Sequence, residues 1–214
     1  YKWLIENDKY YNFCISYKDY ETYKRDGANV DKLLVCPNGA QHRDYHFTEK
    51  PLKPSWTLYL GRIEPRKRQY LYQDIYGVEF VGKYTDTTSF DRNRDCYLGQ
   101  WEHEYKLQHV TDYGNMMLLS DGENGTPLVI KEALVAGLGV VVSKYAAHDL
   151  DTSLPFVTVI PDDKWEDIEY VQKKLIENRK ISVTMRKEIR QYGVDNFSWQ
   201  KLVKTYVENI EGME

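Results

Sequence analysis

Cysteine is scarce in this chain, whose 214 residues include only Cys14, Cys36 and Cys96. An odd number of widely spaced cysteines argues against a disulfide framework and favours reduced thiols in a cytosolic type of compartment. No apolar run approaches the length of a membrane span, and no signal peptide opens the sequence. Because the first residue is not methionine, we expect a processed or excised fragment, in which any targeting segment would be hidden.

Neither sign of charge dominates. The chain has 29 Lys and Arg against 33 Asp and Glu, and the resulting net charge of −4 gives no global attraction to nucleic acid or to an anionic membrane. A hydrophobic content of 42% and a charged content of 29% are typical of a folded globular protein. A chain of this length can bury one substantial core.

Several catalytic signatures are also missing. The sequence has neither a phosphate-binding loop with a Walker lysine nor a Gly-x-Ser-x-Gly elbow. His103-Glu104 lacks the second histidine of a zinc helix, because Leu107 stands in its place. The glycines of Gly137-Leu138-Gly139 follow a predicted helix and precede a predicted strand, which is the reverse of a dinucleotide fingerprint. We therefore predict no metal site.

Short apolar segments alternate with helical patterns along the chain. Strands are predicted at 11–16, 32–36, 56–61, 78–82, 96–99, 115–120, 138–142 and 156–160. Helices are predicted at 18–26, from the cations after Gly61 to about residue 75, and at 102–109, 127–136, 145–150, 164–178, 182–192 and 198–210. Such alternation produces right-handed βαβ units. We therefore predict an α/β fold, with a Rossmann-like parallel sheet covered by helices on both faces.

The segment from Asn124 to Gly139 reads as a loop, a helix and the entry to a buried strand. Thr126 is a candidate N-cap, Pro127 suits the first helical position, and Gly137 is a helix stop. An apolar stripe on this helix is predicted from Leu128, Leu134 and Val135. A glycine-containing loop that feeds a helix N-terminus presents free N–H groups and a positive dipole end. The segment is therefore a candidate site for a phosphate or diphosphate.

The first of the two segments in chain order concentrates positive charge at the end of the predicted strand 56–61, where ligands bind open α/β sheets. Within seven residues it holds four cations, Arg62, Arg66, Lys67 and Arg68. A solvated basic helix start would account for such a run. However, cations at a helix N-terminus oppose the macrodipole, so a bound anion explains them better.

Together these two segments resemble the donor site of retaining glycosyltransferases of the GT-B fold, family 4 in particular. The first matches the family pattern Gly-Arg-x-x-Pro-x-Lys-Gly at Arg62 and Lys67, and departs from it at Arg68. The second matches the family at Gly125, Pro127, Leu128, Val129 and Glu132-Ala133-Leu134.

Two positions of the second segment depart from the family pattern. Asn124 stands in the place of the first of two glutamates, with Glu123 displaced by one residue, and Gly139 replaces the usual proline. In the family that first glutamate contacts the sugar near the reacting centre. The resemblance therefore leaves three alternatives: the Asn124 amide substitutes for it, Glu123 swings in, or activity is weakened.

The resemblance also implies a role for each site residue. Arg62 and Lys67 hold the donor diphosphate, and Glu132 binds the ribose hydroxyls. Trp101 follows a glycine-ended strand that precedes the base site in the family, although it could equally be a core residue. The implied donor-binding residues are Gly61, Arg62, Lys67, Leu98, Trp101, Gly125, Thr126, Pro127, Leu128, Val129 and Glu132. The implied catalytic candidates are Asn124, Glu123, Arg62 and Lys67.

The domain organisation implied by the resemblance has three parts. Residues 1–35 are a remnant of an N-terminal lobe and the interlobe junction, and residues 36–196 are the nucleotide-sugar-binding domain. Residues 197–214, beginning near Phe197-Ser198-Trp199, form a C-terminal helix that packs back across the lobes.

The function implied is transfer of a sugar from a nucleoside diphosphate sugar to an acceptor, with retention and with no cofactor or metal. The expected partners are a nucleotide sugar, an acceptor glycan, lipid or protein, and the missing N-terminal lobe, but no nucleic acid. We expect a cytoplasmic location and no transfer by the isolated chain. The alternative is a non-catalytic or degenerate nucleotide-sugar-binding module that acts as a partner subunit. A generic flavodoxin-like domain would leave the coincidence of the two segments unexplained.

Overall fold

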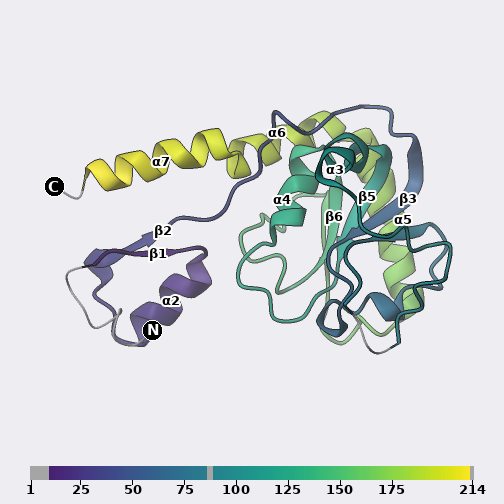
Figure 1. The fold of residues 1–214 in the computed structure, drawn as a ribbon, viewed down its shortest axis with the longest axis horizontal. Coiled ribbons are helices and arrows are strands. Elements are labelled where there is room, and N and C mark those ends of the chain that lie inside the picture. Colours follow the sequence, from purple (N-terminus) through teal and green to yellow (C-terminus); the bar gives the residue numbers. More distant parts are fainter. Residues whose placement is uncertain (1–9, 86–88, 213–214) are drawn as a thin grey trace.

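A five-stranded parallel sheet forms the centre of the protein in a computed structural model that describes residues 10–85 and 89–212 (Figure 1). Its strands lie side by side in the order β4-β3-β5-β6-β7. The strand bounds are Lys53–Leu60 for β3, Val78–Val81 for β4, Tyr113–Leu118 for β5, Gly139–Ser143 for β6 and Val157–Ile160 for β7. The predicted Rossmann-like α/β class is confirmed.

Both faces of the sheet are covered. Every residue of β5 and β6 is buried, as the largely apolar composition of these segments predicts for strands enclosed between two layers of helices. The larger helices are α3 at His103–His109, α4 at Leu128–Val135, α5 at Ile168–Thr184, α6 at Arg186–Phe197 and α7 at Trp199–Glu211. Helix α5 packs on β3, β5, β6 and β7, whereas α4 packs on β5, β6 and α6. Within the described part of the chain, no helix is both long and apolar enough to cross a membrane.

The edge of the sheet beside β4 is extended by the segment around Tyr97, which was predicted as a strand. Tyr97 forms a parallel bridge with Phe80, and the N–H of Leu98 donates to the Phe80 carbonyl at 2.9 Å. Counting this segment, the sequence order of the strands reverses between β3 and β5, the two neighbours at the middle of the sheet. A ligand crevice is expected beyond the carboxyl ends of these two strands.

Two predicted helices are absent from the structure. The segment after Gly61 contains only two short 3₁₀ turns, Pro65–Lys67 and Gln69–Leu71, and residues 145–150 form turns. Arg68 joins the two 3₁₀ turns with φ of 56°. Because an α-helix cannot continue through a left-handed residue, the helical pattern of this segment is interrupted there.

The N-terminal residues form a small unit of their own. Strands β1 at Asn12–Cys14 and β2 at Leu33–Val35 pair in parallel, with helix α2 at Tyr17–Arg25 and the 3₁₀ turn Val30–Lys32 between them. Its buried residues are Cys14, Ala28 and Leu33. Figure 1 shows this unit and α7 on the same side of the sheet domain. The boundaries predicted at residues 35 and 196 remain predictions.

Helix α7 is anchored at its start to the connector that leads to the sheet domain. The N–H of Ala40 donates to the Phe197 carbonyl at 2.7 Å, and the N–H of Trp199 donates to the Ala40 carbonyl at 3.1 Å. The Tyr206 hydroxyl donates to the Pro37 carbonyl. The connector therefore runs beside α7, although α7 itself buries no residue.

Arg186, the first residue of α6, is the largest fully buried side chain. Its guanidinium donates to the carbonyls of Thr48, Tyr113 and Thr111 at 3.1, 3.0 and 2.6 Å and to the Thr111 hydroxyl at 2.8 Å. Burial lowers the pKa of Arg186 to about 10, although the charge of Asp112 raises it, so the guanidinium stays charged at neutral pH.

We expect Arg186→Leu to lower the free energy of unfolding by about 3–5 kcal/mol, because three carbonyls, two of them buried, lose their charged donor. Lys187→Leu is the matched control, since Lys187 is the next residue and its side chain is 70% exposed. Its effect should stay within about 0.5 kcal/mol. Urea unfolding of both variants gives the comparison, and a loss below 1 kcal/mol for Arg186→Leu would contradict the structural role.

Candidate functional site

The candidate site lies beyond the carboxyl ends of β3 and β5, where the strand order reverses. Gly61 follows β3, and its N–H donates to the Val81 carbonyl at 2.9 Å. Gly82 follows β4, and a Cβ there would lie 1.9 Å from the Gly61 carbonyl oxygen. Glycine is therefore required at residue 82 for the two strand ends to approach each other.

The basic segment after Gly61 is fixed by hydrogen bonds from beneath. The buried Tyr59 hydroxyl donates to the Lys67 carbonyl and accepts from the Leu119 N–H at 3.2 Å. The Gln69 amide donates to the Arg62 carbonyl at 2.8 Å. Since Tyr59 belongs to β3 and Leu119 follows β5, these bonds join the loops of both strands.

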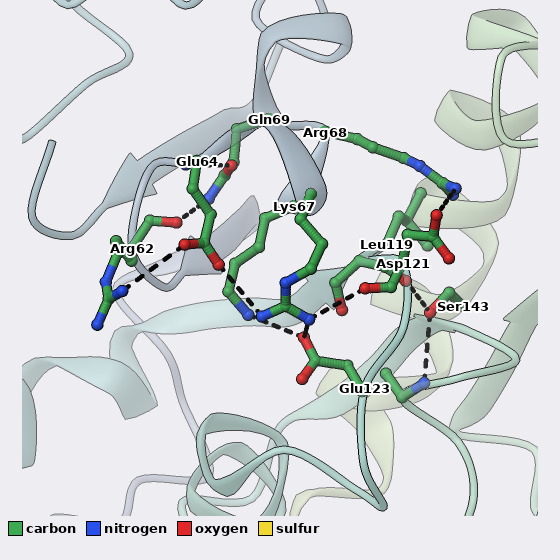
Figure 2. A network of polar contacts seen from close by, with 12 residues as sticks. Arg62, Glu64, Lys67, Arg68, Gln69, Leu119, Asp121, Glu123 and Ser143 are labelled. Carbon is green, nitrogen blue, oxygen red and sulfur yellow. Dashed lines mark hydrogen bonds and ion pairs between the residues drawn. The ribbon is translucent and has the colours of Figure 1, made fainter. Parts of the chain in front are cut away.

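Two of the four cations converge on the carboxylate of Glu123. Lys67 Nζ lies 2.9 Å and Arg66 Nη1 lies 3.1 Å from Glu123 Oε1 (Figure 2). The Lys67 and Glu123 side chains are only 12% and 13% exposed, whereas Arg62 is 63% exposed and lies 3.8 Å from Glu64. Lys67 is therefore a nearly buried cation with a protein carboxylate as its counter-ion, and Arg62 faces solvent.

Glu123 is ionised at neutral pH. Burial favours its neutral form, but the hydrogen bond from Lys67 and the charges of Lys67 and Arg66 outweigh burial and hold the pKa below its usual value. The pair therefore stabilises the fold above the ordinary pKa of a glutamate. This stabilisation is lost as the pH falls through the lowered pKa.

Asn124 points away from the cations. Its amide donates to Asp19 Oδ1 at 2.9 Å, and Lys18 Nζ donates to the Glu123 carbonyl at 3.1 Å. Both partners belong to α2 of the N-terminal unit. Of the two neighbouring side chains, the structure thus brings Glu123 rather than Asn124 to the basic cluster, a choice that local sequence could not make.

Gly125 is enclosed between the N-terminal unit and the turns that follow β6. Its φ is +80°, and a Cβ would lie 2.7 Å from the Ser16 Cβ and 3.2 Å from an Asp149 carboxylate oxygen. A side chain there would be strained by the backbone conformation and by both neighbours. Gly125 therefore permits the N-terminal unit to contact the loop of residues 121–125.

The predicted cap of α4 was wrong. Pro127 is the N-cap, without a side-chain bond, while Thr126 and Asp149 pair reciprocally: the Thr126 N–H donates to Asp149 Oδ2 and the Asp149 N–H donates to Thr126 Oγ1, each at 3.0 Å. The Thr126 N–H is thus occupied by a carboxylate that the sequence did not reveal. The N–H groups of Leu128 and Val129, in the first turn, remain without an intrahelical acceptor.

The apolar stripe predicted on α4 is only partly observed. Leu134 and Val135 are fully buried, but Leu128 is 45% exposed. The difference follows from position, because Leu128 is the first residue of the helix and lies at the open carboxyl edge of the sheet.

Glu132 lies under helix α3. Glu132 is 7% exposed, and Lys106 Nζ donates to its Oε1 at 2.7 Å. It also lies beside the Tyr45 hydroxyl, whose pKa is raised by burial and, to a smaller extent, by Glu132. The hydrogen bonds of the described residues do not link Glu132 to Lys67. Lys106 is a further candidate that sequence reasoning missed, because no local signal pairs α3 with α4.

Leu98 and Trp101 lie on an open pocket of about 810 Å³. Its lining consists of Leu98, Gln100, Trp101, Glu102, Glu104, Tyr105, Gln108 and His109. The Trp101 ring is partly buried and meets Tyr105 edge-on, with 5.1 Å between centroids. The pocket is large and apolar enough for a nucleoside.

No group of three histidine, cysteine or carboxylate side chains that could hold a metal ion occurs in the described ranges 10–85 and 89–212.

The fold is shared with solved glycosyltransferase structures. HepE from Anabaena, in complex with UDP-glucose, has a TM-score of 0.71 and 15% identity over 94% of this chain and 63% of its own. Sucrose-phosphate synthase from Thermosynechococcus elongatus has a TM-score of 0.73 and 16% identity, over 99% of this chain and 60% of its own. The chain has the fold of a GT-B glycosyltransferase lobe.

A third similar structure is that of the lipopolysaccharide outer core galactosyltransferase WaaB. Its TM-score is 0.71 and its identity 18%, over 95% of this chain and 62% of its own. This chain thus spans between 60% and 63% of the length of these three proteins. No family model and no curated protein sequence matches the chain. At such identities the similarity shows the lobe fold alone.

Arg68 offers a test of how the basic loop tolerates a side chain at a position with left-handed backbone. Its guanidinium stacks 3.9 Å over the Trp165 ring and lies 3.4 Å from Asp121. We expect Arg68→Gly to be more stable than Arg68→Ala by about 1 kcal/mol, because both lose these contacts but only glycine adopts positive φ without steric cost.

The control is Lys204, which is 79% exposed in the middle of α7. There glycine should be less stable than alanine by about 1 kcal/mol, the opposite sign. Chemical denaturation measures all four variants. The same order of stability at both positions would contradict the left-handed conformation of Arg68.

Proposed function

We propose that this chain is the donor-binding lobe of a retaining glycosyltransferase of family 4 type, which transfers a sugar from a nucleoside diphosphate sugar to an acceptor. The observation that carries the proposal is the contact of Lys67, in the basic segment after β3, with Glu123 in the loop between β5 and α4. This contact occurs where the strand order reverses in a GT-B lobe, the place where such a sheet binds ligands.

The chemistry requires stabilisation of a leaving diphosphate, which gains negative charge as the glycosidic bond breaks. Arg62 and Lys67 can supply charged donors from one side of the crevice. The free N–H groups of Leu128 and Val129 can supply dipoles from the start of α4. Such donors, fixed before the reaction, would stabilise the developing charge without a metal ion.

We assign the remainder of the donor to the neighbouring helix. The nucleoside would lie on the pocket of Leu98 and Trp101, and Glu132, held by Lys106, would accept from the ribose hydroxyls. HepE was crystallised with UDP-glucose and with UDP, which makes uridine donors the first to test. The acceptor and most of its contacts would come from an N-terminal lobe, so we expect no transfer by this chain alone.

The alternative is a non-catalytic or degenerate nucleotide-sugar-binding module that acts as a partner subunit. The orientation of Asn124 favours it, because this residue, in the place of the family's sugar-binding glutamate, is bonded to Asp19. Sugar transfer after an N-terminal lobe is added would exclude the module. A cytoplasmic location, supported by three free cysteines, is part of either proposal.

Replacing Arg62 or Lys67 with alanine should weaken the binding of UDP roughly tenfold to a hundredfold, because each supplies a charge-assisted hydrogen bond to the diphosphate. Binding of uridine should change far less. Lys187→Ala, at an exposed surface ion pair, is the matched control and should change neither. Calorimetric titration distinguishes these cases. Equal losses for UDP and uridine would remove the diphosphate assignment.

Glu132→Gln should weaken the binding of UDP, because a neutral amide accepts more weakly from the ribose hydroxyls and releases Lys106. A 2′,3′-dideoxy analogue lacks those hydroxyls and should lose little further affinity on the substitution. Binding measured for both nucleotides and both proteins gives a double-mutant type of comparison. If the analogue loses as much affinity as UDP, Glu132 is purely structural.

A further inference from the structure

The carboxylate of Glu123 is bound to Lys67, the residue proposed to hold the donor diphosphate. Glu123 Oε1 forms ion pairs with the Lys67 ammonium, at 2.9 Å, and with the Arg66 guanidinium, at 3.1 Å (Figure 2). Lys67 is only 12% exposed, and two anions at one ammonium repel each other, so a donor phosphate and the Glu123 carboxylate would compete for Lys67. Glu123 thus satisfies the cation in the way that an anionic ligand would.

A nearly buried lysine needs such a partner. Lys67 is 12% exposed, and an unpaired ammonium at this depth would cost several kcal/mol. The loop that carries Glu123 is held from two sides. Asp121 exchanges two bonds with Arg66, through its N–H at 2.9 Å and its carbonyl at 3.0 Å, and Lys18 binds the Glu123 carbonyl at 3.1 Å.

These backbone contacts leave the side chain as the movable part. None of them involves the Glu123 carboxylate, so rotation about its side-chain torsions can free Lys67 while the loop stays in place. The exchange is balanced in charge, because an arriving phosphate replaces the departing carboxylate at the same ammonium. Arg66 is 44% exposed and can follow Glu123 toward solvent.

We propose that Glu123 is an internal competitor of the donor diphosphate, which occupies Lys67 in the empty site and must be displaced before the donor binds. This inference rests on the proposed function of Lys67. The apparent affinity for any diphosphate is then reduced by the fraction of molecules in which Lys67 is free. Ligands without a charged phosphate do not need Lys67, so Glu123 should leave the binding of uncharged nucleosides unchanged.

The test is a titration with UDP at fixed ionic strength, after thermal unfolding has shown that each variant is folded. If Lys67 is free in about a tenth of the molecules, Glu123→Gln should bind UDP roughly tenfold tighter than the wild type. Glu123→Ala should show a similar gain. Asp121→Asn is the matched control. It removes a negative charge from the same loop, but the Asp121 carboxylate pairs with Arg68 and not with Lys67.

A double-mutant cycle separates competition for Lys67 from a general change in the electrostatic potential around the loop. In a Lys67→Ala background, Glu123→Gln should change the affinity for UDP by less than about twofold, because the contested cation is gone. A contact between Glu123 and the donor sugar gives a different pattern, in which Glu123→Gln weakens UDP-glucose and leaves UDP unchanged.

Three results overturn the competitor role and leave the proposed function standing: UDP affinity unchanged or weakened in Glu123→Gln, an equal gain in Asp121→Asn, or an undiminished gain without Lys67. Absence of binding to UDP, ADP and GDP in the wild type and in every variant overturns the proposed function, and the competitor role with it. Each outcome therefore identifies which of the two inferences fails.

Discussion

The ion pair between Lys67 and Glu123 is the interaction on which the candidate site depends. It joins the loops that follow β3 and β5, the two neighbouring strands between which the strand order of the sheet reverses. Both side chains are nearly buried, so loss of either partner would leave an uncompensated charge. The Tyr59 hydroxyl reinforces the junction from below, since it bonds to the backbone of both loops. The conformation of each loop therefore depends on the other.

The N-terminal unit has a direct influence on this junction. Lys18 and Asp19 of α2 bind the Glu123 carbonyl and the Asn124 amide, and Ser16 packs against Gly125. These contacts turn Asn124 outward and present Glu123 to the cations. Residues before β2 thus help to shape a loop more than a hundred positions later in the chain.

At two places the backbone differs from what the sequence predicts, and side chains distant in sequence compensate for the difference. Arg68 has positive φ where the family has glycine, and its guanidinium gains a stacking contact with Trp165 and an ion pair with Asp121. At α4 the expected threonine cap is replaced by the reciprocal pair of Thr126 and Asp149. In both places the backbone is stabilised by a partner distant in sequence.

The sequence by itself determined the fold class, the order of the strands along the chain and the two segments that meet at the site. The spacing of apolar residues and the glycines that end helices are local properties of the sequence. The strands β5 and β6 and the end of α4 before Gly137 could therefore be predicted from neighbouring residues. The prediction of a helix after Gly61 was wrong, because the sequence pattern does not indicate the left-handed backbone of Arg68. Only the tertiary structure decided the ion-pair partners, because Lys67 and Glu123, or Lys106 and Glu132, become neighbours through strand order and helix packing. The physical reason is that the attraction between two charges depends on the distance between them in space and not on their separation along the chain.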